Sequence, residues 1–257
     1  MTNNVAGSID LVEILFTLFW LFFAVLVLYL HRESKREGYP LLSSRGDNVV
    51  VRGFPAEPPP KKFKPAHGDQ YVQVPRPVDD YEPNATPAAA FFGAPLIPSG
   101  DALADGVGPA AWSNREDTPD LTLHGTPRIV PMRTQPSFHV DERDPDPRGM
   151  PVLAADGVEV GTISDAWIDI PEPMIVYLEV GLDASIGTGN VLIPFHFANI
   201  DKAAGQIHVE ALMSGQFAKV PRLQNSDTIT LREEDQVMGY FGGGNLLAEP
   251  SRSEPLL

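Results

Sequence analysis

The stretch that decides how this chain is placed is ILFTLFWLFFAVLVLYL, residues 14–30, which has no charged side chain over 17 positions. Two apolar residues on its N-terminal side extend it to 20 positions, interrupted only by Glu13. At a rise of 1.5 Å per residue, such a helix is about 30 Å long, which matches the hydrocarbon core of a bilayer. Asp10 followed by Glu13 fits the capping box at a helix start. The sequence therefore predicts a transmembrane helix over residues 10–31.

The residues that flank this span favour a retained anchor over a cleaved secretory signal. A signal peptide needs a basic N-terminal region and a small-residue cleavage site, whereas no Lys or Arg precedes the span and LYLHRESKREG ends it. Arg32, Lys35 and Arg36 follow the span directly, and basic residues mark the cytoplasmic end of a membrane helix. We therefore expect residues 1–9 to lie outside the cytoplasm and the chain after residue 31 to lie inside it.

Proline dominates the next segment, since 19 of the 26 prolines lie in residues 40–150. Proline has no N–H donor and disfavours helix, so we expect a connector of extended segments and turns over residues 32–146, with edge strands such as Tyr71–Val74. A solvated linker is the simplest interpretation, but the density of apolar side chains favours a segment laid along a surface, which is either that of this chain or, in preference, that of partner subunits. These side chains are Phe91, Phe92, Leu96, Ile97, Trp112, Ile129, Val130 and Met132.

From about residue 147 the pattern is that of a small, mainly β domain. The dipeptide Asp156-Gly157 before Val158–Val160 indicates a hairpin, and residues 162–170 alternate roughly between the two faces of a strand. Short strands separated by Gly, Asn and Asp turns are typical of a small antiparallel barrel or sandwich. We expect a short helix over Arg232–Tyr240 that ends before three glycines, which places the domain at 147–240 and a loose tail at 241–257. Further strands are expected at Ile175–Val180, Val191–Phe195, Ile207–Ala211 and Thr228–Leu231.

Charge and composition exclude several classes of function. The chain has 34 Asp and Glu against 19 Lys and Arg, and 19 of the acids but only seven of the bases lie in residues 141–257. A protein that binds nucleic acid by neutralising phosphates is therefore not expected. The chain has no Cys, which excludes disulfides, thiolate metal sites and cysteine nucleophiles. An acidic domain next to an anionic leaflet is repelled by the lipid, so a larger membrane protein is expected to hold it there.

The sequence has little catalytic chemistry. It contains no G-x-S-x-G, H-E-x-x-H, Walker or G-x-G-x-x-G motif, and each of these supplies a specific chemical step. His208 and Glu210 share a strand face, but such pairs are common, so we predict no metal site and no catalytic residue. The carboxylates Asp165, Asp169 and Glu172 lie close together in the chain. Crowded carboxylates repel one another, which raises some pKa values, and such groups linked by water can carry protons. A solvated acidic face is the alternative interpretation.

Several stretches resemble one known family in order along nearly the whole chain. They are YLHRESKREGYPL after the span, GDALADGVGPAAW at 100–112, PRIVPM at 127–132, DPRGMPVLAADGVEVGTISDAWIDIPE at 146–172, PFHFANID at 194–201 and VPRLQNSDTITLREEDQVMGYFGGG at 220–244. The chain resembles the H subunit of the purple-bacterial photosynthetic reaction centre. Its domain at 147–240 is similar to the barrel module named after that complex, which also occurs in ribosome-maturation proteins.

The resemblance implies a non-catalytic, single-pass subunit of the bacterial inner photosynthetic membrane, with a periplasmic N-terminus and a cytoplasmic domain that caps the L and M subunits. It implies that the chain stabilises that core, shields the quinone sites and conducts protons from the cytoplasm to the secondary quinone. The chain alone binds no cofactor; bacteriochlorophyll, bacteriopheophytin, quinones, non-haem iron and carotenoid belong to partner subunits. The other implied partners are a light-harvesting antenna ring and membrane lipids. Nucleic acid is not expected as a partner. A membrane-tethered barrel protein with an RNA-maturation or other assembly role is the alternative, followed by an anchored hydrolase.

The resemblance also implies roles for individual residues. Glu172 is the strongest proton-relay candidate, with Asp169 beside it, and His124 matches a family histidine near the point of proton uptake. The family has an aspartate two residues before that histidine and a second histidine two after it, where this chain has Thr122 and Thr126. Asp120 or Glu116 is expected to substitute for them in proton uptake. Candidates for lipid headgroup or subunit contacts are Arg32, Arg36 and Tyr39.

Overall fold

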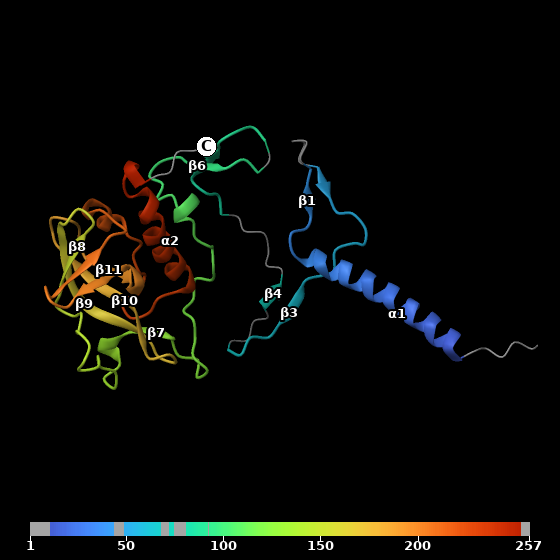
Figure 1. Ribbon diagram of the computed structural model, residues 1–257, viewed down its shortest axis with the longest axis horizontal. Coiled ribbons are helices and arrows are strands. Elements are labelled where there is room, and N and C mark those ends of the chain that lie inside the picture. The colour runs from blue at the N-terminus through green and yellow to red at the C-terminus, as the bar shows by residue number, and fades with distance from the viewer. Residues whose placement is uncertain (1–10, 44–48, 68–71, 75–80, 92, 253–257) are drawn as a thin grey trace, which may run out of the picture. The chain divides into compact units, whose positions relative to one another are not determined.

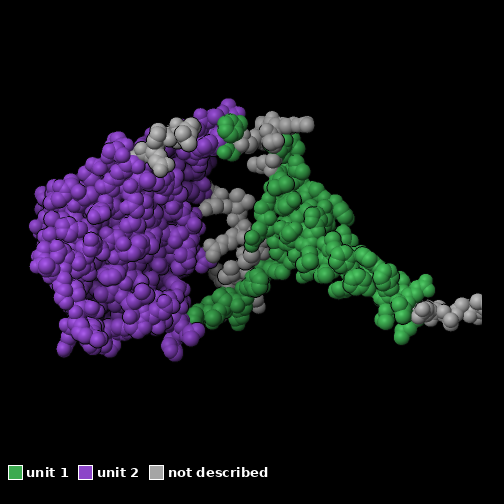
Figure 2. All heavy atoms as spheres, viewed as in Figure 1, with its two compact units in different colours: residues 1–78, 91–93 green, residues 79–90, 94–257 purple. Residues whose placement is uncertain are grey.

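The computed structural model describes residues 11–43, 49–67, 72–74, 81–91 and 93–252 (Figure 1). The chain divides into two compact units, which are residues 1–78 with 91–93 and residues 79–90 with 94–257 (Figure 2). The predicted cap Asp10, the predicted strand residue Tyr71 and the N-terminal segment 1–9 lie outside the described residues.

The first unit begins with the predicted membrane helix. α1 runs over Leu11–Glu33, and none of its side chains is buried within the chain. It is long enough and apolar enough to cross a membrane. Four aromatic rings pack edge to face or stacked on one stripe of α1, spaced three and four residues apart as helical neighbours are; they are Phe16, Phe19, Trp20 and Phe23.

The segment after α1 folds back on the end of that helix. The 3-10 helix η1, Ser34–Arg36, is followed by two short antiparallel pairs. Lys35 is buried, and its ammonium donates to the carbonyl oxygens of Arg52 at 3.1 Å and Pro55 at 2.7 Å. These two bonds tie the chain twenty residues onward to the helix end. The paired strands are β1 (Leu41–Leu42) with β2 (Val50–Val51), and β3 (Lys61–Phe63) with β4 (Val72–Val74).

The second unit is built on one seven-stranded sheet. Six strands follow the order β11-β10-β9-β8-β13-β12, and β7 pairs with β9 beside that path. The chain itself links the two ends of this order, because β11 leads through the 3-10 helix η4 (Phe195–Phe197) into β12, as expected of a sheet curled into a barrel. The strands are β7 (Ile129–Pro131), β8 (Pro151–Ala154), β9 (Glu159–Asp169), β10 (Met174–Leu182), β11 (Asn190–Pro194), β12 (Asn199–Asp201) and β13 (Gln206–Val209).

The sheet confirms a mainly β domain and adds one feature that strand patterning does not show. Its pairs are antiparallel except that β13 runs parallel to β8, so the sheet is mixed. The predicted turn at Gly157 has a positive φ of 75°, which suits glycine, and it joins β8 to β9. The remaining elements are a short pair, β5 (Ala85–Pro87) with β6 (Leu96–Pro98), and the 3-10 helices η2 (Gly108–Ala110), η3 (Met132–Thr134), η4 (Phe195–Phe197), η5 (Ser214–Lys219) and η6 (Pro250–Arg252).

The C-terminal helix α2 covers the sheet and is longer than predicted (Figure 1). It runs over Leu231–Leu247 and includes the three glycines before which the helix was predicted to end. The reason is close packing: a Cβ on Gly243 would lie 2.5 Å from the Cβ of Ala110, and one on Gly244 would lie 2.3 Å from the carbonyl oxygen of Ala211. The absence of a Cβ at Gly243 and Gly244 therefore allows the neighbouring backbone to pack closely against α2. Phe241, one turn nearer the start of the helix, is fully buried.

Two further expectations are corrected. Thr228–Leu231 is not a strand, because Thr230 caps α2: its hydroxyl accepts from the N–H of Glu233, whose carboxylate accepts from the N–H of Thr230. The connector is also partly a component of the barrel unit, since Val130 and Met132 are buried in its core. Phe91, Leu96 and Ile97 are exposed, and Phe92 lies outside the described residues.

Candidate functional site

Three of the predicted relay residues, all of them carboxylates, meet at one guanidinium, that of Arg128. Its Nε and Nη2 lie 2.8 and 2.7 Å from Oδ2 of Asp169. Nη2 also lies 3.2 Å from Oε1 of Glu172, and Nη1 lies 3.6 Å from Oδ2 of Asp120. Sequence reasoning expected these acids to face one another, but a cation lies between them. We call Arg128, Asp120, Asp169 and Glu172 the Arg128 cluster.

Strand pairing places the members of the Arg128 cluster. Arg128 immediately precedes β7, whose first residue Ile129 is the register partner of Asp169 at the end of β9. The backbone N–H of Arg128 donates to the carbonyl of Asp120 at 2.9 Å, and the N–H of Glu172 donates to Oδ1 of Asp169 at 3.3 Å. The backbone therefore fixes the positions from which all three carboxylates reach Arg128.

The Arg128 cluster runs from the interior of the barrel unit to its surface. The side chain of Asp169 is 7% exposed, whereas that of Glu172 is 68% exposed. The hydrogen bond to Asp169 raises the pKa of Arg128, so the guanidinium is charged at every physiological pH. A buried carboxylate needs such a partner, because an unpaired charge in the interior is costly. The cluster thus offers a continuous set of charged oxygen and nitrogen atoms between solvent and a buried position.

Glu234 in the first turn of α2 is a fifth titratable group in this region, and sequence reasoning missed it. Burial raises the pKa of Glu234 to about 7; Arg115 and Arg128 act against the shift, and Asp120 and Asp235 add to it. Its carboxylate forms no hydrogen bond or ion pair with the parts of the chain that the structure describes. A group with a pKa near 7 exchanges protons readily at neutral pH.

The only feature of the sequence that singles out Glu234 is its position shortly after the helix cap Thr230. The neighbouring Glu233 shares this feature. Glu233 is buried too, but its oxygens accept from the N–H groups of Gln224 at 2.7 Å and Thr230 at 2.8 Å. Glu233 is therefore a structural cap, and only packing distinguishes it from Glu234.

His124 lies at the tip of a tight hairpin whose base carries Asp120 and Arg128, and its side chain forms no hydrogen bond or ion pair with the Arg128 cluster. Leu121 and Pro127 form the bridge that closes this hairpin, and the hydroxyls of Thr122 and Thr126 lie 2.8 Å apart within it. The two threonines that replace the family's acid and histidine therefore bond to each other and hold the turn. The His124 side chain is exposed, and its imidazole contacts no charged partner among the described residues.

Asp165 does not join Asp169 and Glu172, although it is close in sequence. Its Oδ2 lies 3.1 Å from Nη1 of Arg133, which also lies 2.6 Å from Oε2 of Glu179. Both carboxylates are buried. Arg133 follows β7 and Arg128 precedes it, so guanidinium groups near the two ends of that strand bind two separate groups of acids.

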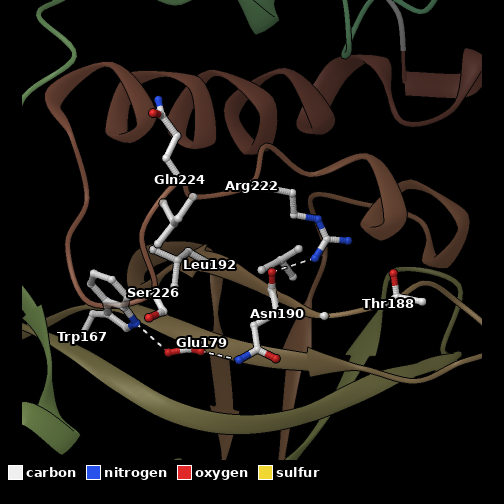
Figure 3. Close-up of a pocket in the computed structure, with 11 residues that line it drawn as sticks. Trp167, Glu179, Thr188, Asn190, Leu192, Arg222, Gln224 and Ser226 are labelled. Atoms are coloured by element: carbon white, nitrogen blue, oxygen red, sulfur yellow. Dashed lines mark hydrogen bonds between the residues drawn. The ribbon is translucent and has the colours of Figure 1, made fainter.

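A pocket of about 830 Å³ opens beside Glu179, one of the two acids that Arg133 binds (Figure 3). Glu179 lies on its floor, where Oε2 accepts from the indole N–H of Trp167 at 2.9 Å and Oε1 accepts from the amide of Asn190. Arg222 lines the rim and donates to the carbonyl of Asn190 at 2.7 Å. Because both Glu179 oxygens are occupied by donors, this network is a packed structural feature of the barrel.

The residues predicted to contact lipid or partner subunits lie just after α1. Arg32 is exposed, whereas Arg36 is bound within the chain, 2.9 Å from Oε1 of Glu33. Tyr39 is half-buried, with the Lys35 ammonium 5.1 Å from its ring centroid. Arg36 and Tyr39 therefore have intrachain roles in shaping the end of the helix.

Family comparisons agree with this geometry along both parts of the chain. The photosynthetic reaction centre H-chain N-terminal region matches residues 3–134, and the PRC-barrel domain matches residues 139–214. The first match covers just over half of the chain and includes α1, Arg128 and β7. The second covers the barrel strands from β8 to β13. The chain belongs to the family of H subunits of the photosynthetic reaction centre.

Proposed function

We propose that this H subunit conducts protons from the cytoplasm towards the secondary quinone, while it stabilises the L and M subunits and shields their quinone sites from bulk water. The chain has no catalytic chemistry of its own in this proposal. The quinones, bacteriochlorophyll, bacteriopheophytin, carotenoid and non-haem iron are bound by the partner subunits.

The observation that carries the proposal is the Arg128 cluster together with Glu234. Doubly reduced quinone needs two protons, and a site buried from water receives them only through relay groups. Glu172 is open to solvent, Asp169 is buried, and Arg128 contacts both. Glu234, with its pKa near 7, can hold a proton that a carboxylate of ordinary pKa would release. In this arrangement Glu172 and Asp120 collect protons, and Asp169 lies at the inner end of the cluster.

The orientation of the chain is part of the proposal. Basic residues follow α1 and none precedes it, so the barrel is expected on the cytoplasmic side. Protease added to the periplasmic face of sealed vesicles should leave the barrel intact. Cleavage of the barrel from that face would contradict the orientation.

Glu172→Gln tests the relay role, because it removes the titratable proton while it keeps the side-chain size. In reaction-centre complexes that contain this variant, the second, proton-coupled electron transfer to the quinone should slow, with unchanged pigment absorbance. Glu142→Gln, at an exposed residue away from Arg128, is the matched control. Wild-type kinetics in Glu172→Gln would contradict the relay role of this residue and leave the family membership intact.

The RNA-maturation alternative conflicts with the charges of the barrel. Residues 141–257 contain 19 acids and seven bases, and several of those bases are already paired with acids. Lys219 lies 2.7 Å from Asp101, and Arg148 lies 2.5 Å from Asp146. A surface that binds RNA needs free cations for phosphates, so retention of this protein on RNA at physiological salt is not expected.

A further inference from the structure

The part of the first unit that follows α1 is basic, in contrast to the rest of the chain. Within the described residues between 31 and 67, seven Lys and Arg stand against three Glu. Two of the bases, Lys35 and Arg36, are used within the chain by the carbonyl and carboxylate contacts described above. The remaining bases of this segment are Arg32, Arg52, Lys61, Lys62 and Lys64.

Ion pairing holds the strand β3 at the end of α1. The Lys61 ammonium lies 3.0 Å from Oε2 of Glu33, the last residue of α1. The Arg36 guanidinium, itself paired with Glu33, donates to the carbonyl of Pro59 just before β3. Figure 1 shows β3 beside this end of the helix. Because α1 is a membrane span, its end and β3 lie at the level of the lipid headgroups.

Lys62 in β3 and Lys64 directly after it carry the free charges of this segment. Side chains alternate along a strand, so Lys62 points away from the face on which Lys61 binds Glu33, and Lys64 directly follows the end of β3. Both are exposed, and neither forms an ion pair with any residue that the structure describes. Phe63 between them is 52% exposed. Two free ammonium groups and an aromatic ring at the membrane level are typical of a surface that binds lipid.

We propose that Lys62 and Lys64 form a binding site for the anionic phosphate headgroups of phospholipids next to α1. The inference requires α1 to span the membrane but does not depend on proton conduction. Each Lys close to an anionic bilayer strengthens binding about fivefold, and the attraction is screened within roughly 10 Å at 0.1 M salt. This contact also offsets the repulsion between the acidic barrel and the same leaflet, since it attaches the connector to the lipid surface.

The test is a lipid titration of the full-length chain in neutral detergent micelles, with bound lipid counted by native mass spectrometry. Wild-type chain should bind phosphatidylglycerol in preference to phosphatidylcholine. In Lys62→Gln/Lys64→Gln, half-saturation by phosphatidylglycerol should rise about 25-fold, and Lys62→Arg/Lys64→Arg should restore binding. Lys202→Gln, which removes a lysine from the barrel unit, is the control and should bind as wild type does.

Three results would overturn the proposal. The first is unchanged phosphatidylglycerol binding in Lys62→Gln/Lys64→Gln. The second is an equal loss of phosphatidylcholine, which would indicate general contact with acyl chains. The third is wild-type lipid binding combined with loss of the L and M subunits from the purified complex, which would assign the lysines to an acidic protein surface. Each of these leaves the Glu172 kinetics untouched, so failure here is separate from failure of the proposed function.

Discussion

Replacing Glu234 with Gln should stabilise the protein above pH 7 and leave its stability nearly unchanged at pH 4.5. Burial raises the pKa of Glu234 from its ordinary value of 4.5 to about 7. The folded protein therefore holds a proton between these pH values that the unfolded chain releases. Stability falls as pH rises through this window, because the folded state must then carry a poorly solvated carboxylate.

The size of the effect follows from the shift. A change of about 2.5 pKa units corresponds to roughly 3 kcal/mol at about 1.4 kcal/mol per unit. Glu234 is partly exposed, so solvent screening reduces this to about 1–2 kcal/mol. Glu234→Gln removes the charge and so removes the penalty at pH 8. The gain in unfolding free energy at pH 8, relative to pH 4.5, should therefore be about 1–2 kcal/mol.

Denaturant unfolding of the full-length chain in detergent, followed by circular dichroism between pH 4.5 and 8, measures this gain. Glu142→Gln, at an exposed position, is the control and should show no pH-dependent difference from wild type. The reasoning is refuted if the difference between Glu234→Gln and wild type is the same at both pH values, or if the variant is destabilised only at high pH.

Two further substitutions test the packing that supports the site. Gly243→Ala should lower the free energy of unfolding by about 1–3 kcal/mol, because its Cβ would overlap Ala110. Gly242→Ala, whose Cβ would have nothing within 4 Å, should stabilise the helix by up to about 1 kcal/mol. Thermal unfolding of the two variants distinguishes packing from helix propensity, and equal effects would contradict the close approach at Gly243. Arg133→Met should lower the free energy of unfolding by about 3–5 kcal/mol, because it leaves two buried carboxylates without their cation. Arg143→Ala, which breaks an exposed ion pair, is the comparison. An equal or smaller loss of stability in Arg133→Met would show that the two carboxylates do not depend on Arg133.

Local patterns in the sequence predicted the elements, because they report local physics. The uncharged run predicted α1 within two residues of its observed end, and the Asp156-Gly157 turn predicted the β8–β9 hairpin. A turn dipeptide and a run of apolar residues act within a few positions of the chain, so a single sequence is sufficient to find them. The same patterns do not report which strands become neighbours, and the parallel pairing of β13 with β8 was missed.

Long-range pairing determined the candidate site, and for that reason only part of it was predicted. The resemblance to the H subunit indicated Asp120, Asp169 and Glu172, but their common partner Arg128 is 41 residues from Asp169 in sequence. Asp165 was grouped with the wrong acids, since residues four apart on a strand lie about 13 Å from each other along it, and Asp165 and Asp169 therefore meet guanidinium groups at opposite ends of β7. Glu234 required knowledge of burial, because its sequence context is the same as that of the capping residue Glu233.

Flash-induced proton uptake measured with a pH-indicator dye tests the central claim most directly. Complexes that contain Asp169→Asn together with Glu172→Gln keep Arg128 but lose the titratable groups at both ends of its cluster. The account predicts slower proton uptake after the second flash, with pigment absorbance and the first electron transfer unchanged. Uptake at the wild-type rate would contradict it and would mean that protons reach the quinone by a route outside the Arg128 cluster.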